Sequence, residues 1–117
     1  MRNPVDGDRM RLAGWLALGA SLLTVGLVAY GAWVRASGSG LGCPDWPLCK
    51  GSVVPALEGD TAIEFGHRLF AGITMLVTAA AALLAWRSRA ENRVAAWLIT
   101  GALGAILVQA ALGGATV

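Results

Sequence analysis

Three long apolar runs alternate with polar segments along this chain. The runs cover residues 12–34, 62–86 and 94–117, and they contain no charged side chain except Glu64 and Arg68 at the start of the second run. At about 1.5 Å per residue the first run reaches about 34 Å, enough to cross a hydrocarbon core of about 30 Å. The pattern predicts an all-α integral membrane bundle with three transmembrane helices.

The polar segments that separate the runs differ in length. Residues 1–11 form a short N-terminal segment, residues 35–61 a long loop and residues 87–93 a short connector. A basic segment before an apolar run also occurs in secretory signals. However, the first run is longer than a signal core of about 7–15 residues, and no clear small-residue cleavage site follows it. We therefore expect the first run to span the membrane.

Basic residues are unevenly distributed between these polar segments. The long loop contains only Arg35 and Lys50, whereas the N-terminal segment and the connector each contain three arginines. Basic residues collect on the cytoplasmic side of membrane proteins. We therefore predict a multi-pass protein of the cell membrane, embedded in the lipid bilayer, whose N-terminus is cytoplasmic and whose long loop lies on the outer face. The six arginines that decide this orientation are Arg2, Arg9, Arg11, Arg87, Arg89 and Arg93.

Composition strengthens the membrane assignment. The chain is 56% hydrophobic and only 14% charged, with a mean hydropathy of +0.65. Soluble domains contain about 25% charged residues. A net charge of +2 without a basic aromatic surface gives no reason to expect a nucleic acid partner.

Both cysteines of the chain, Cys43 and Cys49, lie in the long loop. Thiols on the outer face of a membrane meet oxidising conditions, and Pro44 and Pro47 favour a compact turn between them. We predict a disulfide. It either holds the loop in shape or exchanges electrons with a partner, and the spacing, wider than a thioredoxin-like Cys-x-x-Cys, favours the first role. A metal site is not favoured, because the chain has no second Cys/His pair.

The second run begins with charged residues on consecutive turns of a predicted helix. Thr61 and Glu64 have the spacing of a capping box, in which Thr61 caps the helix and Glu64 bonds back to its backbone. Arg68 follows Glu64 at the spacing and in the order that favour an ion pair. Glu64 therefore has a structural interpretation as well as a catalytic one.

His67 is the only histidine of the chain, and it lies three residues further along the predicted helix. Ionisable groups inside a membrane are costly and are candidates for functional sites. Imidazole is a common metal ligand and a usual axial ligand of haem iron. The alternative is an interfacial histidine that bonds a loop carbonyl. Arg68 and Arg35, at the same predicted edge of the membrane, are candidates to bind a haem propionate.

Several motifs together resemble one family. They are GAWVRASGSGLGCPDWPLCKG after the first run, IEFGHR at the start of the second, and VQAALGGATV at the end of the third. In their order and spacing they resemble the haem A synthase family, which has a Gly-Ser-Gly loop with a cysteine pair, a Glu-x-x-His-Arg motif and a Gln-x-x-Leu-Gly-x-x-Thr-Val motif.

The resemblance implies an integral membrane oxidoreductase that converts haem O to haem A, oxidising a porphyrin methyl group to a formyl group by successive hydroxylations. It implies a full-length fold of two four-helix bundles, one for the substrate haem and one for haem b, with paired axial histidines. Glu64 matches the family's essential outer-face carboxylate and His67 its first haem-ligating histidine. Cys43 and Cys49 match a loop pair that is expected to form a disulfide. Haem O synthase is a candidate partner.

One histidine cannot supply two axial ligands to one iron. We therefore expect either that the chain is an N-terminal portion whose fourth helix follows residue 117, or that a second chain completes the haem site. The first is favoured, since no polar tail follows Val117. Two other functions stay open: a non-catalytic haem-binding or electron-transfer subunit that uses His67, and a membrane thiol oxidoreductase that uses Cys43 and Cys49.

Overall fold

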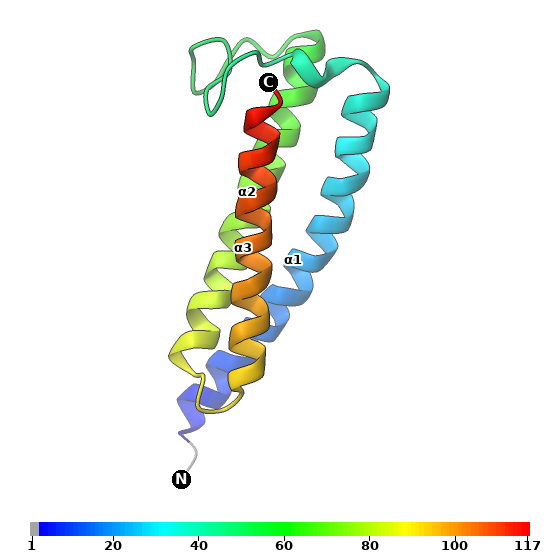
Figure 1. Ribbon diagram of the computed structural model, residues 1–117. Helices are drawn as coiled ribbons and strands as arrows, with labels where there is room; N and C mark the ends of the chain where they lie inside the picture. Colours follow the sequence, from blue (N-terminus) through cyan, green and yellow to red (C-terminus); the bar gives the residue numbers. More distant parts are fainter. Residues whose placement is uncertain (1–2) are drawn as a thin grey trace.

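The computed structural model describes residues 3–117 and contains three long helices (Figure 1). They are α1 (Pro4–Ala36), α2 (Gly59–Arg87) and α3 (Arg93–Ala115), and a short 3₁₀ turn, η1 (Ser39–Leu41), follows α1. All three are long and apolar enough to cross a membrane. The all-α membrane bundle predicted from the apolar runs is therefore confirmed.

The first helix begins earlier than the apolar run that predicted it. Asn3 caps α1 by accepting a hydrogen bond from the Val5 N–H (3.1 Å), Pro4 occupies the first turn and Asp6 follows it. These are standard helix-start residues. Residues 4–11, expected as a polar segment, are therefore two helical turns that extend the first membrane helix. Hydropathy predicts only the part of a helix that lies in lipid, so it does not show that α1 continues beyond the apolar run.

The second helix begins at Gly59, so Thr61 lies inside its first turn and does not cap it. The N-cap residue is Glu58, which makes no side-chain capping bond. The predicted capping box is therefore wrong: the Thr61 hydroxyl donates to the Gly42 carbonyl (3.0 Å), and the Glu64 carboxylate accepts from the Cys43 N–H. Both side chains bond to the loop that precedes the helix.

The connector between the second and third helices is short. The last residue of α2 is Arg87, and Asn92 caps α3 by accepting a hydrogen bond from the Ala95 N–H (2.9 Å). α3 ends at Ala115, two residues before the predicted end of the third run. The predicted bounds of this helix and of the connector differ from the observed ones by one or two residues.

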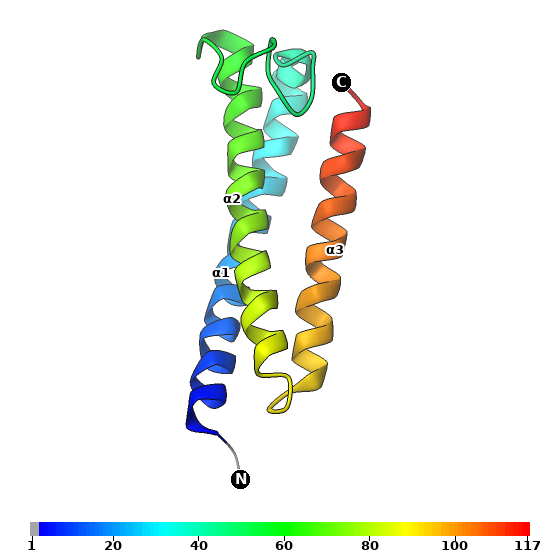
Figure 2. The same cartoon turned by 90° about the vertical axis from the view of Figure 1, so that its left-hand side faces the viewer.

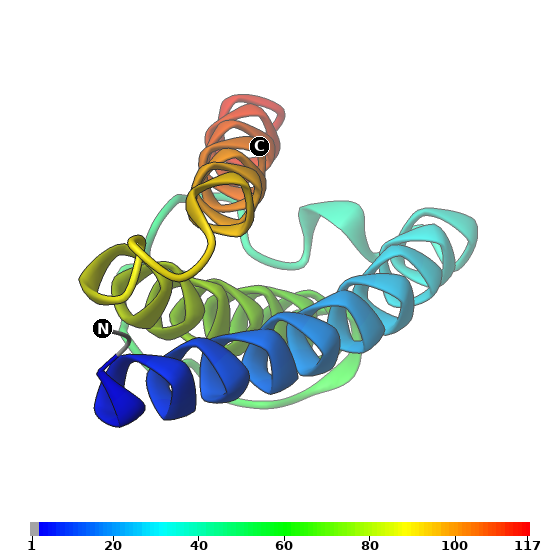
Figure 3. The same ribbon diagram turned by 90° about the horizontal axis from the view of Figure 1, so that it is seen from below.

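The helices form an elongated bundle in which α2 packs against both α1 and α3 (Figures 1 and 3). One end of the bundle holds residues 37–58, between α1 and α2, together with the C-terminus. We call it the loop end. The opposite end holds the start of α1 and the connector of residues 88–92, and we call it the connector end (Figure 2). Arg9 and Arg11 of α1 thus lie toward the same end as the connector, as the arginine distribution requires.

Small side chains form the helix contacts. At the connector end Ala13 of α1, Ala85 of α2 and Ala96 of α3 are each 0% exposed and form one cluster. Many large apolar residues, among them Leu76 and Leu98, point outward. Lipid-facing Leu and buried Ala or Thr are typical of membrane helices, where small residues let backbones approach closely. In the second half of α2 the buried positions recur mostly at a spacing of three or four residues: Thr74, Thr78, Ala81, Ala82 and Ala85; nearer its start Thr61 and Glu64 are buried.

Candidate functional site

Glu64 lies in the second turn of α2 and is only 5% exposed. Its Oε1 accepts a hydrogen bond from Nη2 of Arg68 (2.6 Å), and its Oε2 accepts one from the Cys43 N–H (3.0 Å). The ion pair predicted from the spacing of Glu64 and Arg68 is therefore present. The second bond joins this carboxylate to the loop.

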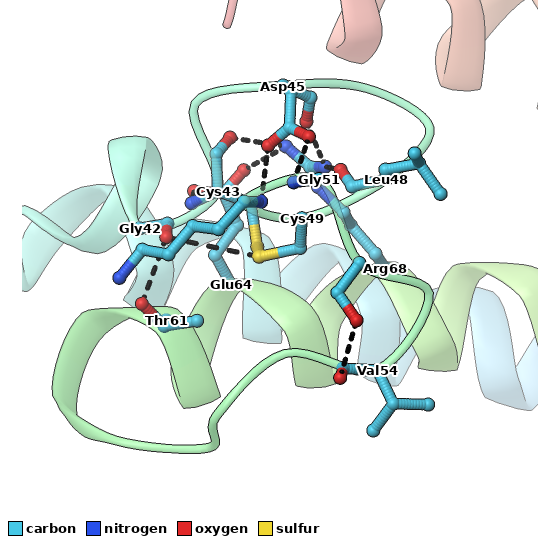
Figure 4. The surroundings of a disulfide bond; sticks show 12 residues. Gly42, Cys43, Asp45, Leu48, Cys49, Gly51, Val54, Thr61, Glu64 and Arg68 are labelled. Carbon is cyan, nitrogen blue, oxygen red and sulfur yellow. Dashed lines mark hydrogen bonds and ion pairs between the residues drawn. A yellow bond between two sulfur atoms is a disulfide. The ribbon is translucent and has the colours of Figure 1, made fainter.

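Arg68 bonds to the loop more extensively than to Glu64. Nη1 donates to the carbonyls of Asp45 (2.6 Å) and Leu48 (2.8 Å), and Nη2 donates to the Cys43 carbonyl (2.8 Å) as well as to Glu64 (Figure 4). A guanidinium has five N–H donors, and these four bonds use all those on Nη1 and Nη2. Only Nε–H is left for another acceptor such as a haem propionate.

Cys43 and Cys49 form the predicted disulfide (Figure 4). Cys43 is 0% exposed and Cys49 1% exposed, because the loop folds back over the start of α2. Thiol–disulfide exchange requires a thiolate to reach a sulfur atom. The burial of both cysteines therefore supports a disulfide that holds the loop in shape.

The turn enclosed by the disulfide is organised around Asp45. Its carboxylate accepts hydrogen bonds from the backbone N–H groups of Lys50 and Gly51. The pKa of Asp45 is lowered, chiefly by the Gly51 N–H, and the charge of Arg68 contributes in the same direction. The ionised carboxylate is thus a structural part of the loop.

His67 contacts α1 and makes none of these loop bonds. The ring is partly buried, and its centroid lies 5.6 Å from that of Tyr30 in an edge-to-face arrangement. Its Nε2 lies 3.1 Å from the position that a Cβ would take on Gly31. The ring tip therefore abuts the backbone of α1.

Arg35 is not part of this cluster. It lies in the last turn of α1 with an exposed side chain, and within residues 3–117 no hydrogen bond or ion pair reaches its guanidinium. The structure thus brings together Glu64, Arg68 and the disulfide, places His67 next to them on α2, and leaves Arg35 apart. The predicted catalytic and haem-binding roles of these residues stay predictions.

Two residues near this site were missed in the sequence. Tyr30 donates from its hydroxyl to the Ile63 carbonyl (3.0 Å) and contacts His67. The signal was available, because it is the only tyrosine and lies in an apolar run, where a phenol hydroxyl needs a partner. Trp46, which lies in the loop between the two cysteines, packs on Gly114 in the last turn of α3: a Cβ there would lie 2.8 Å from the indole. That contact had no local signal.

No group of three or more His, Cys, Asp and Glu side chains that could hold a metal ion occurs in residues 3–117. A metal bound at this site through His67 would therefore arrive with most of its own ligands, as haem iron does.

Comparison with known proteins identifies the family. Residues 14–62 and 57–117 match the family model of cytochrome oxidase assembly proteins (COX15-CtaA). The chain is also 38% identical to the heme A synthase of Bacillus licheniformis over 88 residues, which are 74% of this chain and 29% of that protein. The chain belongs to the haem A synthase family. The family motifs thus come with a membrane fold, and the protein is a membrane protein.

Other relatives extend this comparison. The heme A synthase of Symbiobacterium thermophilum is 36% identical over 77% of this chain and 30% of its own length. A Thermus thermophilus protein named protoheme IX farnesyltransferase is 46% identical over 68% of this chain and 13% of its own length. The chain thus spans less than a third of the length of these relatives. No solved structure matches it.

Proposed function

We propose that this chain forms part of a haem A synthase, in which Glu64 and His67 serve the oxidation of a methyl group of haem O to the formyl group of haem A. The observation that carries the proposal is a buried carboxylate one helical turn from the only imidazole, in a chain whose relatives include heme A synthases. Such a pair at one end of a membrane helix is costly to maintain without a function.

The residues around His67 suit a haem in their chemistry. His67 would hold the haem iron through its imidazole, and Tyr30, Trp33 and Phe70 form an aromatic cluster next to it. When bound, a haem supplies a redox-active iron. As the chain has one histidine, any second histidine that holds the iron would come from residues outside these 117 or from a second chain.

Glu64 acts in this proposal as a fixed negative charge. Its two oxygens are oriented by Arg68 and by the Cys43 N–H, so the carboxylate needs no reorganisation to stabilise positive charge developing on a nearby substrate. Each oxygen accepts one of these bonds and keeps a lone pair, so the carboxylate can also accept a proton. The fixed orientation and the ion pair with Arg68 favour electrostatic stabilisation as its role.

Arg68 and the disulfide hold that carboxylate in place. Arg68 bonds simultaneously to Glu64 and to three carbonyls of the loop, so the position of the carboxylate depends on the fold of the loop. Arg68 therefore serves here as a positioning residue. Its remaining Nε–H is the donor that could reach a propionate.

The proposal places the N-terminus and the connector in the cytoplasm and the loop end on the outer face. The arginine distribution supports this orientation, and so does a disulfide, which persists in an oxidising compartment. Haem O synthase is the proposed supplier of substrate, supported by the relative named protoheme IX farnesyltransferase that shares this segment.

The test uses the full-length protein, purified from membranes of cells that make haem O. We expect a Soret band that His67→Ala weakens to the share contributed by the haem b of the other bundle, and an extracted porphyrin that bears a formyl group. Glu64→Gln should keep the Soret band and stop formation of the formyl product. Glu58→Gln is the matched control, because Glu58 is exposed and caps α2 without a side-chain bond.

Two results would contradict the proposal. A wild-type protein without a Soret band would exclude haem binding, and full activity of Glu64→Gln would remove the role of the carboxylate. The thiol oxidoreductase alternative predicts that thiol exchange proceeds without haem. The burial of both cysteines does not favour it.

A further inference from the structure

Two adjacent residues of α1 and two adjacent residues of α2 interlock. In each pair an aromatic ring stands next to a glycine: Tyr30 next to Gly31 on α1, and His67 next to Gly66 on α2. Each ring packs against the glycine of the other helix. A Cβ on Gly66 would displace the Tyr30 hydroxyl, and a Cβ on Gly31 would crowd the tip of the imidazole and push it back by a few tenths of an ångström.

The first half of this interlock is the contact of Tyr30 with α2. A Cβ on Gly66 would clash with the Tyr30 hydroxyl. The hydroxyl donates to the Ile63 carbonyl (3.0 Å), which is the carbonyl that the His67 N–H faces in a regular α-helix. Tyr30 is therefore bonded to the helical turn that carries Glu64 and His67.

The second half is the contact of His67 with α1. The three ring atoms nearest to the Cβ position of Gly31 are Nε2 (3.1 Å), Cε1 (3.7 Å) and Cδ2 (3.9 Å). The tip of the imidazole thus faces the backbone of α1, while the edge-to-face contact with Tyr30 fixes the ring from the side. An iron atom cannot fit between Nε2 and Gly31 at these distances.

We propose that Tyr30 is a positioning residue for His67: together with Gly31 and Gly66 it holds the imidazole docked on α1 with Nε2 covered. The functional consequence rests on the proposed haem ligation by His67. Ligation through Nε2 requires the ring to leave Gly31, so docking and ligation compete. The apparent affinity for haem is then the intrinsic affinity multiplied by the fraction of molecules in which the ring is undocked.

The docking itself can be tested without haem, because His67 is the only histidine of the chain. Diethyl pyrocarbonate acylates exposed imidazole nitrogens, and mass spectrometry of the peptide that contains His67 gives the rate. We expect Tyr30→Phe and Gly66→Ala to raise this rate roughly fivefold, the effect of losing one hydrogen bond of about 1 kcal/mol. Gly72→Ala is the matched control, since no atom lies within 4 Å of a Cβ there.

Protection of the Cys43–Cys49 disulfide from a dithiol shows whether each variant is folded. If Gly66→Ala fails to fold, Tyr30→Phe, which removes a single oxygen atom, decides the result. An unchanged or lower acylation rate in Tyr30→Phe would overturn the docking.

The second arm measures haem binding to the full-length protein by Soret titration. Gly31→Ala places a methyl group in the slot of the imidazole, so we expect haem to bind roughly fivefold more tightly, for the same loss of about 1 kcal/mol in docking. Weaker or unchanged binding would overturn the competition between docking and ligation. A wild-type protein that binds no haem would contradict the proposed function, and the acylation rates would still decide the role of Tyr30.

Discussion

The connector end and the loop end are held together by different interactions. At the connector end the helices meet in an apolar contact, in which Ala13, Ala85 and Ala96 are fully buried against one another; we call it the alanine joint. At the loop end the contact is polar, because Glu64 and Arg68 bond α2 to the backbone of the loop; we call it the polar joint. Close packing spreads its energy over many weak contacts. A buried polar network depends on each of its members, because removing one leaves its partners unsatisfied.

This difference has a consequence for where chemistry can be placed. Every side-chain nitrogen or oxygen that is buried within residues 3–117 has a hydrogen-bond partner. The loop end can therefore hold a carboxylate in a fixed orientation near the membrane edge. The alanine joint contains no polar side chain that could take part in chemistry. Its small residues let the helices approach closely with no contribution from the loop.

The largest effect is expected from Arg68→Ala. This change leaves the Glu64 carboxylate without its ion-pair partner, and removing one partner of a buried pair costs about 3–5 kcal/mol. The free energy of unfolding in mixed micelles and the hydrogen exchange of the Cys43 amide measure it. Arg89→Ala is the control at the connector end, where an exposed Arg89 bonds the Trp86 carbonyl and lies over the Trp86 ring; we expect a loss of about 1 kcal/mol or less. An equal loss of unfolding free energy in both variants would show that the bonds of Arg68 contribute no more to stability than those of an exposed arginine.

A smaller effect is expected from overpacking the connector end with Ala85→Leu. Ala85 is 0% exposed, and extra methylene groups in a packed contact cost about 1–3 kcal/mol. Ala80→Leu is the control, because Ala80 lies on an exposed face of the same helix. Exchange at the Cys43 amide should stay unchanged in Ala85→Leu. Faster exchange there would mean that the two joints are coupled and that the comparison fails.

The smallest effect is expected from the protonation of Asp45. Since the folded-state pKa is lowered, the contribution of the ionised carboxylate to the loop is complete above the unfolded-state pKa of about 4 and is lost as the pH falls through the lowered value. Relative to a small-molecule disulfide in the same buffer, which corrects for protonation of the phosphine, the Cys43–Cys49 disulfide should therefore be reduced somewhat faster at about pH 3 than at about pH 6. Asp45→Asn should weaken this pH dependence, and Asp8→Asn at the connector end should not. A pH response that is identical in all three proteins would contradict the role of Asp45.

Much of the fold could be predicted from hydropathy, because each helix has to bury its backbone in lipid. The cores of α2 and α3 were placed within a few residues. The start of α1 was missed because Asn3 and Pro4 begin a helix outside the apolar run. The predicted capping box was wrong for a similar reason. Thr61 bonds to Gly42 and Glu64 bonds to Cys43, and a local motif cannot show partners so far away in sequence.

The candidate site was only partly predictable. The Glu64–Arg68 pair follows from helical spacing and the disulfide from the compartment, and both are present. The three loop carbonyls that Arg68 bonds depend on the folded path of the loop, which no periodicity encodes. The contact of His67 with Gly31 depends on the register of α1 against α2. The sequence can predict that the imidazole of His67 is partly buried, but it cannot predict that Nε2 points toward Gly31.

The contact of Trp46 with Gly114 also bears on biosynthesis. It joins a residue that leaves the ribosome early to a turn of α3 that is made much later. The bonds of Glu64 and Arg68 to the loop use only residues 43–68, and the alanine cluster needs only the start of α3. The chain is made from its N-terminus onward. The partners of Glu64 therefore exist before α3 does, and the contact of Trp46 with Gly114 is the last of these to become possible.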